Sequence, residues 1–144
     1  MECITSGRLE ATGLSTNEGD VAALRNQLAA TQPGERDRIV RELTAELEFR
    51  TPPLITWQDI LWPAHCGDYC RFEGEVGLKE LSSLSAEGDG WQYFLEHVAE
   101  PLPDDLGPED LPQQLSEDGR ASSLAVYHFR CLGCAQSVIR WDLD

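Results

Sequence analysis

The stretch that decides the fold is YHFRCLGCAQSVIRWDLD, residues 127–144. Apolar and polar side chains alternate on both sides of a short turn: Tyr127, His128, Phe129 and Arg130 before it, and Ile139, Arg140, Trp141, Asp142, Leu143 and Asp144 after it. An alternation of period two is typical of a strand with one buried face. Two such runs joined by the turn CLGC predict an antiparallel hairpin with a cysteine knuckle at its tip.

The knuckle holds two of the five cysteines in the chain. Cys131 and Cys134 are spaced C-x2-C, and Cys66 and Cys70, in HCGDYC, are spaced C-x3-C. Two short-spaced pairs provide the four ligands of a tetrahedral zinc site. We therefore predict one structural zinc held by Cys66, Cys70, Cys131 and Cys134. Gly133 is expected to supply the unusual backbone angles of a tight knuckle.

Two other interpretations of the cysteines stay open. Reduced cysteines are often buried as small apolar side chains. Disulfides are the third interpretation, but five cysteines, including Cys3, do not close a paired framework. The first residues, MECITSGRLEATG, lack the basic and apolar parts of a secretory signal, and no apolar run is long enough for a membrane span. A cytoplasmic location is expected, where thiols stay reduced.

The rest of the chain predicts a small α+β fold. Apolar residues at helical spacing around 21–28 and 39–47, separated by a Pro-Gly turn, indicate an N-terminal helical hairpin. Thr51-Pro52-Pro53 ends it, which predicts a boundary near residue 50 between an appendage (1–50) and an α+β domain (51–144). Within that domain we expect a strand at 71–76 and short helices at 78–84 and 90–98. Together with the C-terminal cysteine hairpin, these elements make one small domain with an antiparallel sheet.

The negative charge is concentrated in one segment. The net charge is −15, and residues 73–118 contain 13 acidic side chains but only one basic residue, Lys79. Such a field repels nucleic acid and attracts a basic protein partner. The predicted partner-binding surface consists of Trp91, Tyr93, Asp104, Asp105, Glu109, Asp110, Glu117 and Asp118. The alternative is that the acids form a solvated face that keeps the protein soluble.

No pattern in the sequence points to catalysis. The chain has no G-x-S-x-G, H-E-x-x-H, G-x-x-x-x-G-K or G-x-G-x-x-G motif. His65 and Cys66 are neighbours, but adjacent residues on a strand point to opposite faces, so we expect their side chains not to meet. We therefore predict that the protein is not an enzyme.

From Arg50 to its end, the chain resembles the CbrC family of small bacterial cytosolic proteins linked to colicin tolerance. The matching pieces are Arg50-Thr51-Pro52, Trp57-Gln58, Trp62, His65-Cys66, Asp68, Cys70, Phe72, Gly74, Phe129-Arg130-Cys131, Cys134, Trp141-Asp142 and Asp144. Members of that family usually begin with further Cys-x-x-Cys pairs, whereas this chain has only Cys3 before its helical hairpin. A metal site within the first 50 residues is therefore not expected.

Resemblance and charge point to the same function. Colicins and their relatives include nucleases, whose active surfaces are basic because they bind phosphates. We expect an immunity protein that binds and blocks a nuclease toxin, a DNase more than an RNase, with no direct contact to nucleic acid or membrane. The alternative is a zinc-stabilised cytosolic adaptor or regulatory module with a different protein partner.

Overall fold

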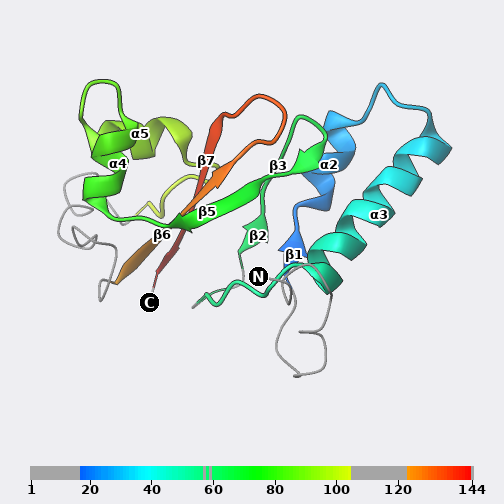
Figure 1. Cartoon of the computed structure of the whole chain (residues 1–144), viewed down its shortest axis with the longest axis horizontal. Helices are drawn as coiled ribbons and strands as arrows, with labels where there is room; N and C mark the ends of the chain where they lie inside the picture. Colours follow the sequence, from blue (N-terminus) through cyan, green and yellow to red (C-terminus); the bar gives the residue numbers. More distant parts are fainter. Residues whose placement is uncertain (1–16, 57, 59, 105–122, 144) are drawn as a thin grey trace. The chain divides into compact units, whose positions relative to one another are not determined.

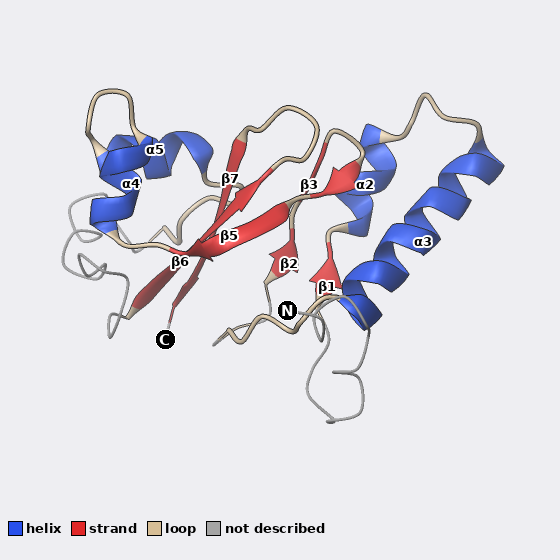
Figure 2. Ribbon diagram, viewed as in Figure 1, coloured by secondary structure: helices blue, strands red, loops and turns tan. Residues whose placement is uncertain are grey.

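The computed structural model describes residues 17–56, 58, 60–104 and 123–143. The chain divides into two compact units, which are described separately below. Unit 1 comprises Met1–Cys70 and Cys131–Ala135, and unit 2 comprises Arg71–Arg130 and Gln136–Asp144. Figures 1 and 2 show the elements of each unit along the chain. The expected α+β class is confirmed.

Unit 2 is built on a three-stranded antiparallel sheet with the order β5-β6-β7. Its strands are β5 (Arg71–Glu75), β6 (Leu124–Arg130) and β7 (Ser137–Leu143). β6 and β7 pair without a break from Leu124 opposite Leu143 to Arg130 opposite Ser137. This is the hairpin that the alternating C-terminal sequence predicts, and the strand expected at 71–76 is present as β5.

Two short helices cover one face of this sheet. α4 (Leu78–Leu84) and α5 (Gly90–His97) match the helices expected from the sequence. The buried core that they share with the sheet consists of Val76, Leu81, Phe94, Leu124, Val126 and Ile139. On the other face, the ring of Phe72 packs against those of Tyr127 and Phe129. The first six residues of β6 are all buried.

Polar side chains determine where these helices begin. The Asp89 carboxylate accepts the backbone N–H groups of Trp91 and Gln92, which have no partner within α5. At the start of α4, the Glu80 carboxylate accepts the N–H of Gly77 at 3.0 Å. These two acids therefore stabilise helix ends, and their charge is not surplus surface charge.

We expect the substitution Gly90→Ala to destabilise unit 2 by about 1–3 kcal/mol, since overpacking of a tight contact costs that much. A Cβ at Gly90 would lie 2.8 Å from the backbone nitrogen of Ser82 and 2.9 Å from the carbonyl oxygen of Leu78, neither of which moves easily. Gly34→Ala is the matched control, because a Cβ there meets nothing within 4 Å. Urea unfolding of both variants tests this; equal stabilities would mean that α4 and α5 are not so tightly packed.

Unit 1 contains the two N-terminal helices and two small strand pairs. The helices are α2 (Val21–Gln27) and α3 (Pro33–Arg50). The strands β1 (Glu18–Gly19) and β2 (Leu61–Trp62) pair in parallel, and β3 (Ala64–His65) and β4 (Asp68–Tyr69) form an antiparallel hairpin. The buried apolar side chains of this unit include Leu24, Val40, Leu47, Trp62 and Tyr69.

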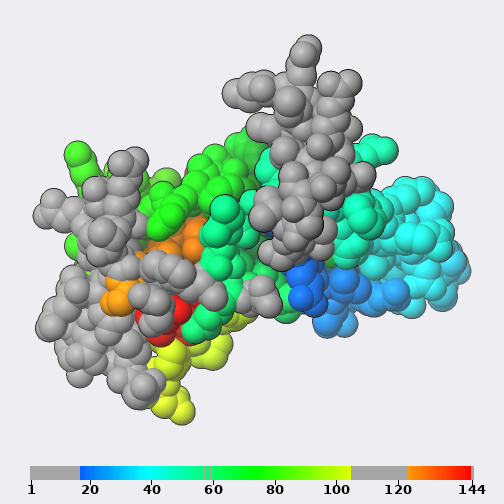
Figure 3. Space-filling view, turned by 90° about the horizontal axis from the view of Figure 1, so that it is seen from below, coloured from blue at the N-terminus to red at the C-terminus, as the bar shows by residue number. Residues whose placement is uncertain are grey.

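The two predicted helices are present, and an ion pair between Arg25 and Asp37 at 2.7 Å links them. Pro33 and Gly34, which we expected in the turn, are instead the first two residues of α3. α3 ends at Arg50, just before Thr51-Pro52, as expected from the prolines. Figure 3 shows α3 (cyan) at the surface of unit 1. In the structure the two helices belong to the same compact unit as residues 51–70. Among the described residues, no helix has the length and apolar character required to cross a bilayer.

Candidate metal centre

The first part of the centre is the turn of the β3–β4 hairpin. His65 pairs with Asp68, so Cys66 and Gly67 form a two-residue turn, and their φ angles are 56° and 78°. Positive φ at both positions characterises the tight turn that matches the twist of a hairpin. The Gln27 side chain on α2 holds this turn: its amide donates to Ala64 O at 2.7 Å, and its oxygen accepts the Gly67 N–H at 2.9 Å.

The second part is the loop that joins β6 to β7, Cys131–Ala135, which belongs to unit 1. Its closing hydrogen bond runs from the N–H of Ala135 to the carbonyl of Cys131 at 3.0 Å. The positive φ of this loop falls on Ala135, at 62°, and not on Gly133. The expectation that Gly133 supplies the unusual backbone angles of the knuckle was therefore wrong. A Cβ at Gly133 would lie only 3.2 Å from the Cβ of Cys66, so glycine allows the two loops to approach.

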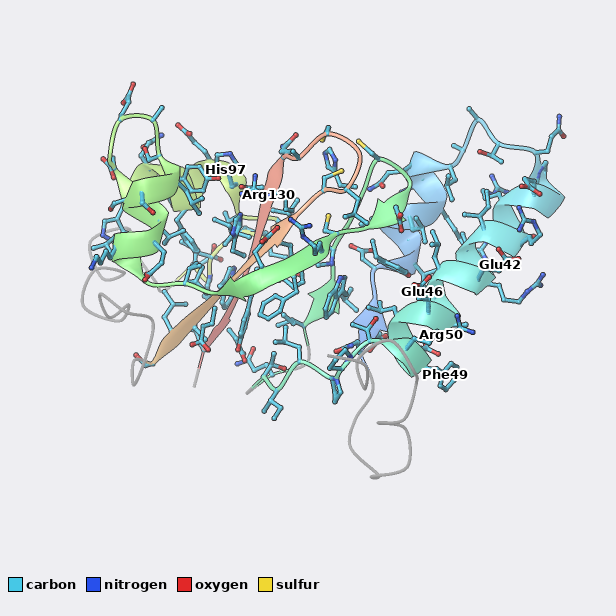
Figure 4. All side chains as sticks on the ribbon, viewed as in Figure 1. Glu42, Glu46, Phe49, Arg50, His97 and Arg130 are labelled. Atoms are coloured by element: carbon cyan, nitrogen blue, oxygen red, sulfur yellow. The ribbon has the colours of Figure 1, made fainter. Side chains whose placement is uncertain are left out.

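The two loops bring together three thiols and one imidazole. The ligand atoms of His65, Cys66, Cys131 and Cys134 all lie within 4.8 Å of one another. The Nδ1 atom of His65 is 3.2 Å from Cys66 Sγ and 3.5 Å from Cys134 Sγ. Figure 4 shows the sulfur atoms (yellow) beside the β6–β7 loop. These four side chains could hold a metal ion such as zinc.

Three of the four predicted ligands, Cys66, Cys131 and Cys134, are in this group, but Cys70 is not. Cys70 follows β4 and is only 3% exposed. Its N–H donates to the carbonyl of Pro63 at 2.9 Å, and its carbonyl accepts the indole N–H of Trp62 at 2.7 Å. Burial, with the neighbouring thiols, raises the pKa of Cys70 to about 12. The four described cysteines form no disulfide with one another.

His65 is the member of the group that the sequence analysis missed. We expected His65 and Cys66 to point to opposite faces of a strand, and this expectation was wrong. Cys66 lies in the hairpin turn, where its positive φ replaces the extended backbone that produces alternation. The signal was present in the sequence, because a Cys-Gly dipeptide between two short extended runs is compatible with a two-residue turn.

The thiols influence one another's ionisation. Hydrogen bonds with the thiols of Cys131 and Cys134 raise the pKa of Cys66 to about 11. Burial acts to raise the pKa of Cys131, but hydrogen bonds from the Cys134 backbone, the His65 side chain and the Gly133 backbone outweigh it and lower that pKa to about 6. Neighbouring thiolates repel one another, so without a cation the cluster favours one thiolate at a time. A bound divalent cation removes that repulsion.

The predicted partner-binding residues lie partly within the described chain. Trp91 and Tyr93 are on α5, partly buried against the core of unit 2. The Tyr93 ring stacks on His97, with centroids 4.0 Å apart. Asp104 is exposed. The other predicted residues, Asp105, Glu109, Asp110, Glu117 and Asp118, lie outside the described residues.

Unit 2 contains a buried polar network that the sequence analysis did not find. The Tyr93 hydroxyl donates to Ser137 Oγ at 2.5 Å, and His128 Nε2 lies 2.9 Å from the same oxygen. His128 and Ser137 are 4% and 6% exposed, so their polar atoms depend on each other for hydrogen bonds. These hydrogen bonds link α5 to the hairpin β6–β7.

We expect this network to make the stability of unit 2 sensitive to mild acid. Burial, and then the charge of Arg130, lower the pKa of His128 below its ordinary 6.5. The unfolded chain therefore takes up a proton as the pH falls below about 6.5, while the folded chain resists it, so the free energy of unfolding decreases. Urea unfolding at pH 7.5 and 5.5 should show a smaller loss for His128→Gln than for the parent. Equal losses would contradict this role.

Comparison with known proteins shows that the chain belongs to the family described as "Uncharacterised protein family (UPF0167)", which it matches over residues 1–143. A UPF0167 protein of Pseudomonas aeruginosa is 31% identical over 107 residues, covering 74% of this chain and 54% of the relative. UPF0167 proteins of Mycobacterium bovis and Mycobacterium tuberculosis are each 33% identical over 98 residues, covering 68% of this chain and 49% of the relative. The chain thus spans about half the length of these curated relatives. No solved structure gives a significant match.

Proposed function

We propose that this UPF0167 chain is an immunity protein that neutralises a bacterial nuclease toxin, most directly a DNase, by covering its basic nucleic-acid-binding surface. The observation that carries the proposal is the charge asymmetry: 13 of the 26 acids lie in residues 73–118, beside one base. A nuclease surface must be basic to bind phosphates, so the two fields are complementary. The resemblance to the CbrC family, with its link to colicin tolerance, supports the same proposal.

The described part of unit 2 indicates which acids are available to a partner. Glu80 and Asp89 stabilise helix starts, and Glu100 pairs with Arg140. Glu87 and Glu96 are exposed and cap no helix. Leu95, next to Glu96 on α5, is a large apolar side chain with 40% of its surface exposed.

An exposed leucine beside an exposed acid has the composition of a small binding anchor with a charged rim. The anchor contributes most of the affinity when it is desolvated, while the rim mainly accelerates association with an oppositely charged partner. Trp91 and Tyr93 are partly buried against the core of unit 2. In this proposal their exposed parts extend the anchor. Binding by this surface is stoichiometric and requires no chemical step.

We also propose that the Cys/His group holds one structural zinc ion. Thiolate and imidazole donors suit zinc, whereas calcium and magnesium take oxygen ligands. The same group favours the second candidate function, a zinc-stabilised adaptor or regulatory module. That alternative predicts bound zinc together with a protein partner other than a nuclease.

A growth-rescue experiment tests the function. Where the gene beside this one encodes a nuclease domain, cells that express that domain should grow when this protein is co-expressed. A variant that neutralises two acids on an unrelated surface, Glu42→Gln with Glu46→Gln on α3 (labelled in Figure 4), should protect equally well. Failure of the parent protein to protect cells, despite normal zinc content, would favour the adaptor.

A further inference from the structure

We infer that the zinc site in unit 1 is a Cys3His site in which His65 Nδ1 is the fourth ligand and Cys70 is not a ligand. The inference rests on the proposed structural zinc and goes beyond it by assigning the four ligand atoms. It replaces the set of four cysteines expected from the sequence. It holds whether the partner of the protein is a nuclease or not.

The distances between the donor atoms agree with tetrahedral coordination. With Zn–S near 2.3 Å and Zn–N near 2.0–2.1 Å, a tetrahedral site places a nitrogen roughly 3.6 Å from each sulfur. His65 Nδ1 lies 3.5 Å from Cys134 Sγ and 3.2 Å from Cys66 Sγ. These two nitrogen–sulfur pairs therefore stand about as far apart as a tetrahedral ion requires, and the remaining pairs of donor atoms lie within 4.8 Å of one another.

The imidazole presents Nδ1, not Nε2, to the sulfurs. Both close contacts of the ring with thiols are made by Nδ1. The backbone of the same residue also faces the site, since its carbonyl accepts the Cys131 thiol at 3.5 Å. His65 is thus fixed on both sides by the cluster, and its Nδ1 is the natural donor.

Cys70 is held in the core of unit 1 by its surroundings. Its two backbone hydrogen bonds, to Pro63 and from Trp62, fix the end of β4. The side chain of Cys70 is only 3% exposed, and its sulfur is not among the donor atoms that lie within 4.8 Å of one another. The ligand atom of His65, in contrast, is one of those donor atoms.

The proposed ion would link two tight turns that are far apart in the sequence. His65 and Cys131 are 66 positions apart in the chain, and each lies in or beside a short turn. Ligands of a structural site assemble only on folding, so the free energy of zinc binding becomes free energy of folding.

Cobalt(II) replacement tests the ligand set directly, because the visible spectrum of tetrahedral cobalt responds to each thiolate and nitrogen donor. Purified full-length protein is stripped of metal and titrated with Co²⁺, and zinc competition then gives the affinity. We expect one equivalent with the spectrum of three sulfurs and one nitrogen. His65→Cys should keep tight binding and shift the d–d bands to longer wavelength, as a fourth sulfur requires. His65→Ala should weaken zinc binding by more than the 10- to 100-fold that loss of a supporting hydrogen bond typically costs.

Cys70→Ala and Cys70→Ser are the matched controls, one apolar and one polar. Either variant that folds should bind one equivalent with the spectrum of the parent protein. Loss of a sulfur charge-transfer contribution in a Cys70 variant, with an unchanged spectrum in His65→Cys, would overturn the assignment while leaving the structural zinc intact. A parent protein that binds no cobalt or zinc would instead refute the proposed zinc itself.

Discussion

Chelation of the proposed zinc ion should unfold unit 1 or lower its stability by several kcal/mol. Structural zinc contributes about 10–16 kcal/mol of apparent binding free energy in small zinc-finger peptides, and unit 1 has only a modest core of its own. Without a cation, the three thiols of Cys66, Cys131 and Cys134 no longer share a counter-charge. Elemental analysis should find about one zinc per chain, and scanning calorimetry with excess chelator should show a markedly lower melting temperature.

The control variant for this experiment changes a residue in the same loop. Leu132, between two proposed ligands, is 61% exposed and offers no ligand atom. Leu132→Ser should keep one equivalent of zinc and nearly the melting temperature of the parent. Cys134→Ser should behave like the chelated protein. A metal-free protein as stable as the zinc-loaded one would mean that the cysteines are simply packed as reduced thiols.

Neutralising two exposed acids of unit 2 should slow association with the toxin by about 10-fold at low salt, since electrostatic steering accelerates encounter by 10- to 1,000-fold. The variant is Glu87→Gln with Glu96→Gln, and the salt dependence of its association rate should be weaker than that of the parent. The melting temperature should change little, because neither residue caps a helix, and Glu96→Gln keeps a side-chain oxygen that can accept from the Gln92 amide, as Glu96 does at 2.8 Å.

Glu42→Gln with Glu46→Gln removes the same charge from α3 and serves as the matched control. It should leave the association rate within about twofold of the parent, since steering depends on where the charge lies. Stopped-flow binding at two salt concentrations separates the two variants. Equal rates for all three proteins would identify the acids of unit 2 as a solvated surface only.

The elements of unit 2 were predictable because their signals are local. Alternation in 127–143 and proline or glycine at element ends depend only on neighbouring residues, and the corresponding strands and helices are present. Three of the four residues in the Cys/His group were also predictable, because cysteine spacing is itself a local signal. The parallel pair β1–β2 was not predictable, since two-residue strands carry no periodicity.

The choice between His65 and Cys70 could not be made from spacing. It depends on one backbone conformation, the positive φ of Cys66, which turns its side chain toward that of its neighbour. It also depends on Trp62 and Pro63, which hold the backbone of Cys70 in the core. The Tyr93–Ser137–His128 network was likewise hidden, because its members come from a helix and two strands that meet only in the folded unit.

The most direct test of the proposed function is a titration of nuclease activity. A nuclease domain encoded by a neighbouring gene is the candidate toxin. It is mixed with increasing amounts of the purified, zinc-loaded protein, and DNA cleavage is measured at nanomolar concentrations. We expect cleavage to fall linearly and to end at one protein per nuclease, with both proteins intact afterwards. Full cleavage in the presence of excess protein, or inhibition at far lower ratios with destruction of the nuclease, would contradict it.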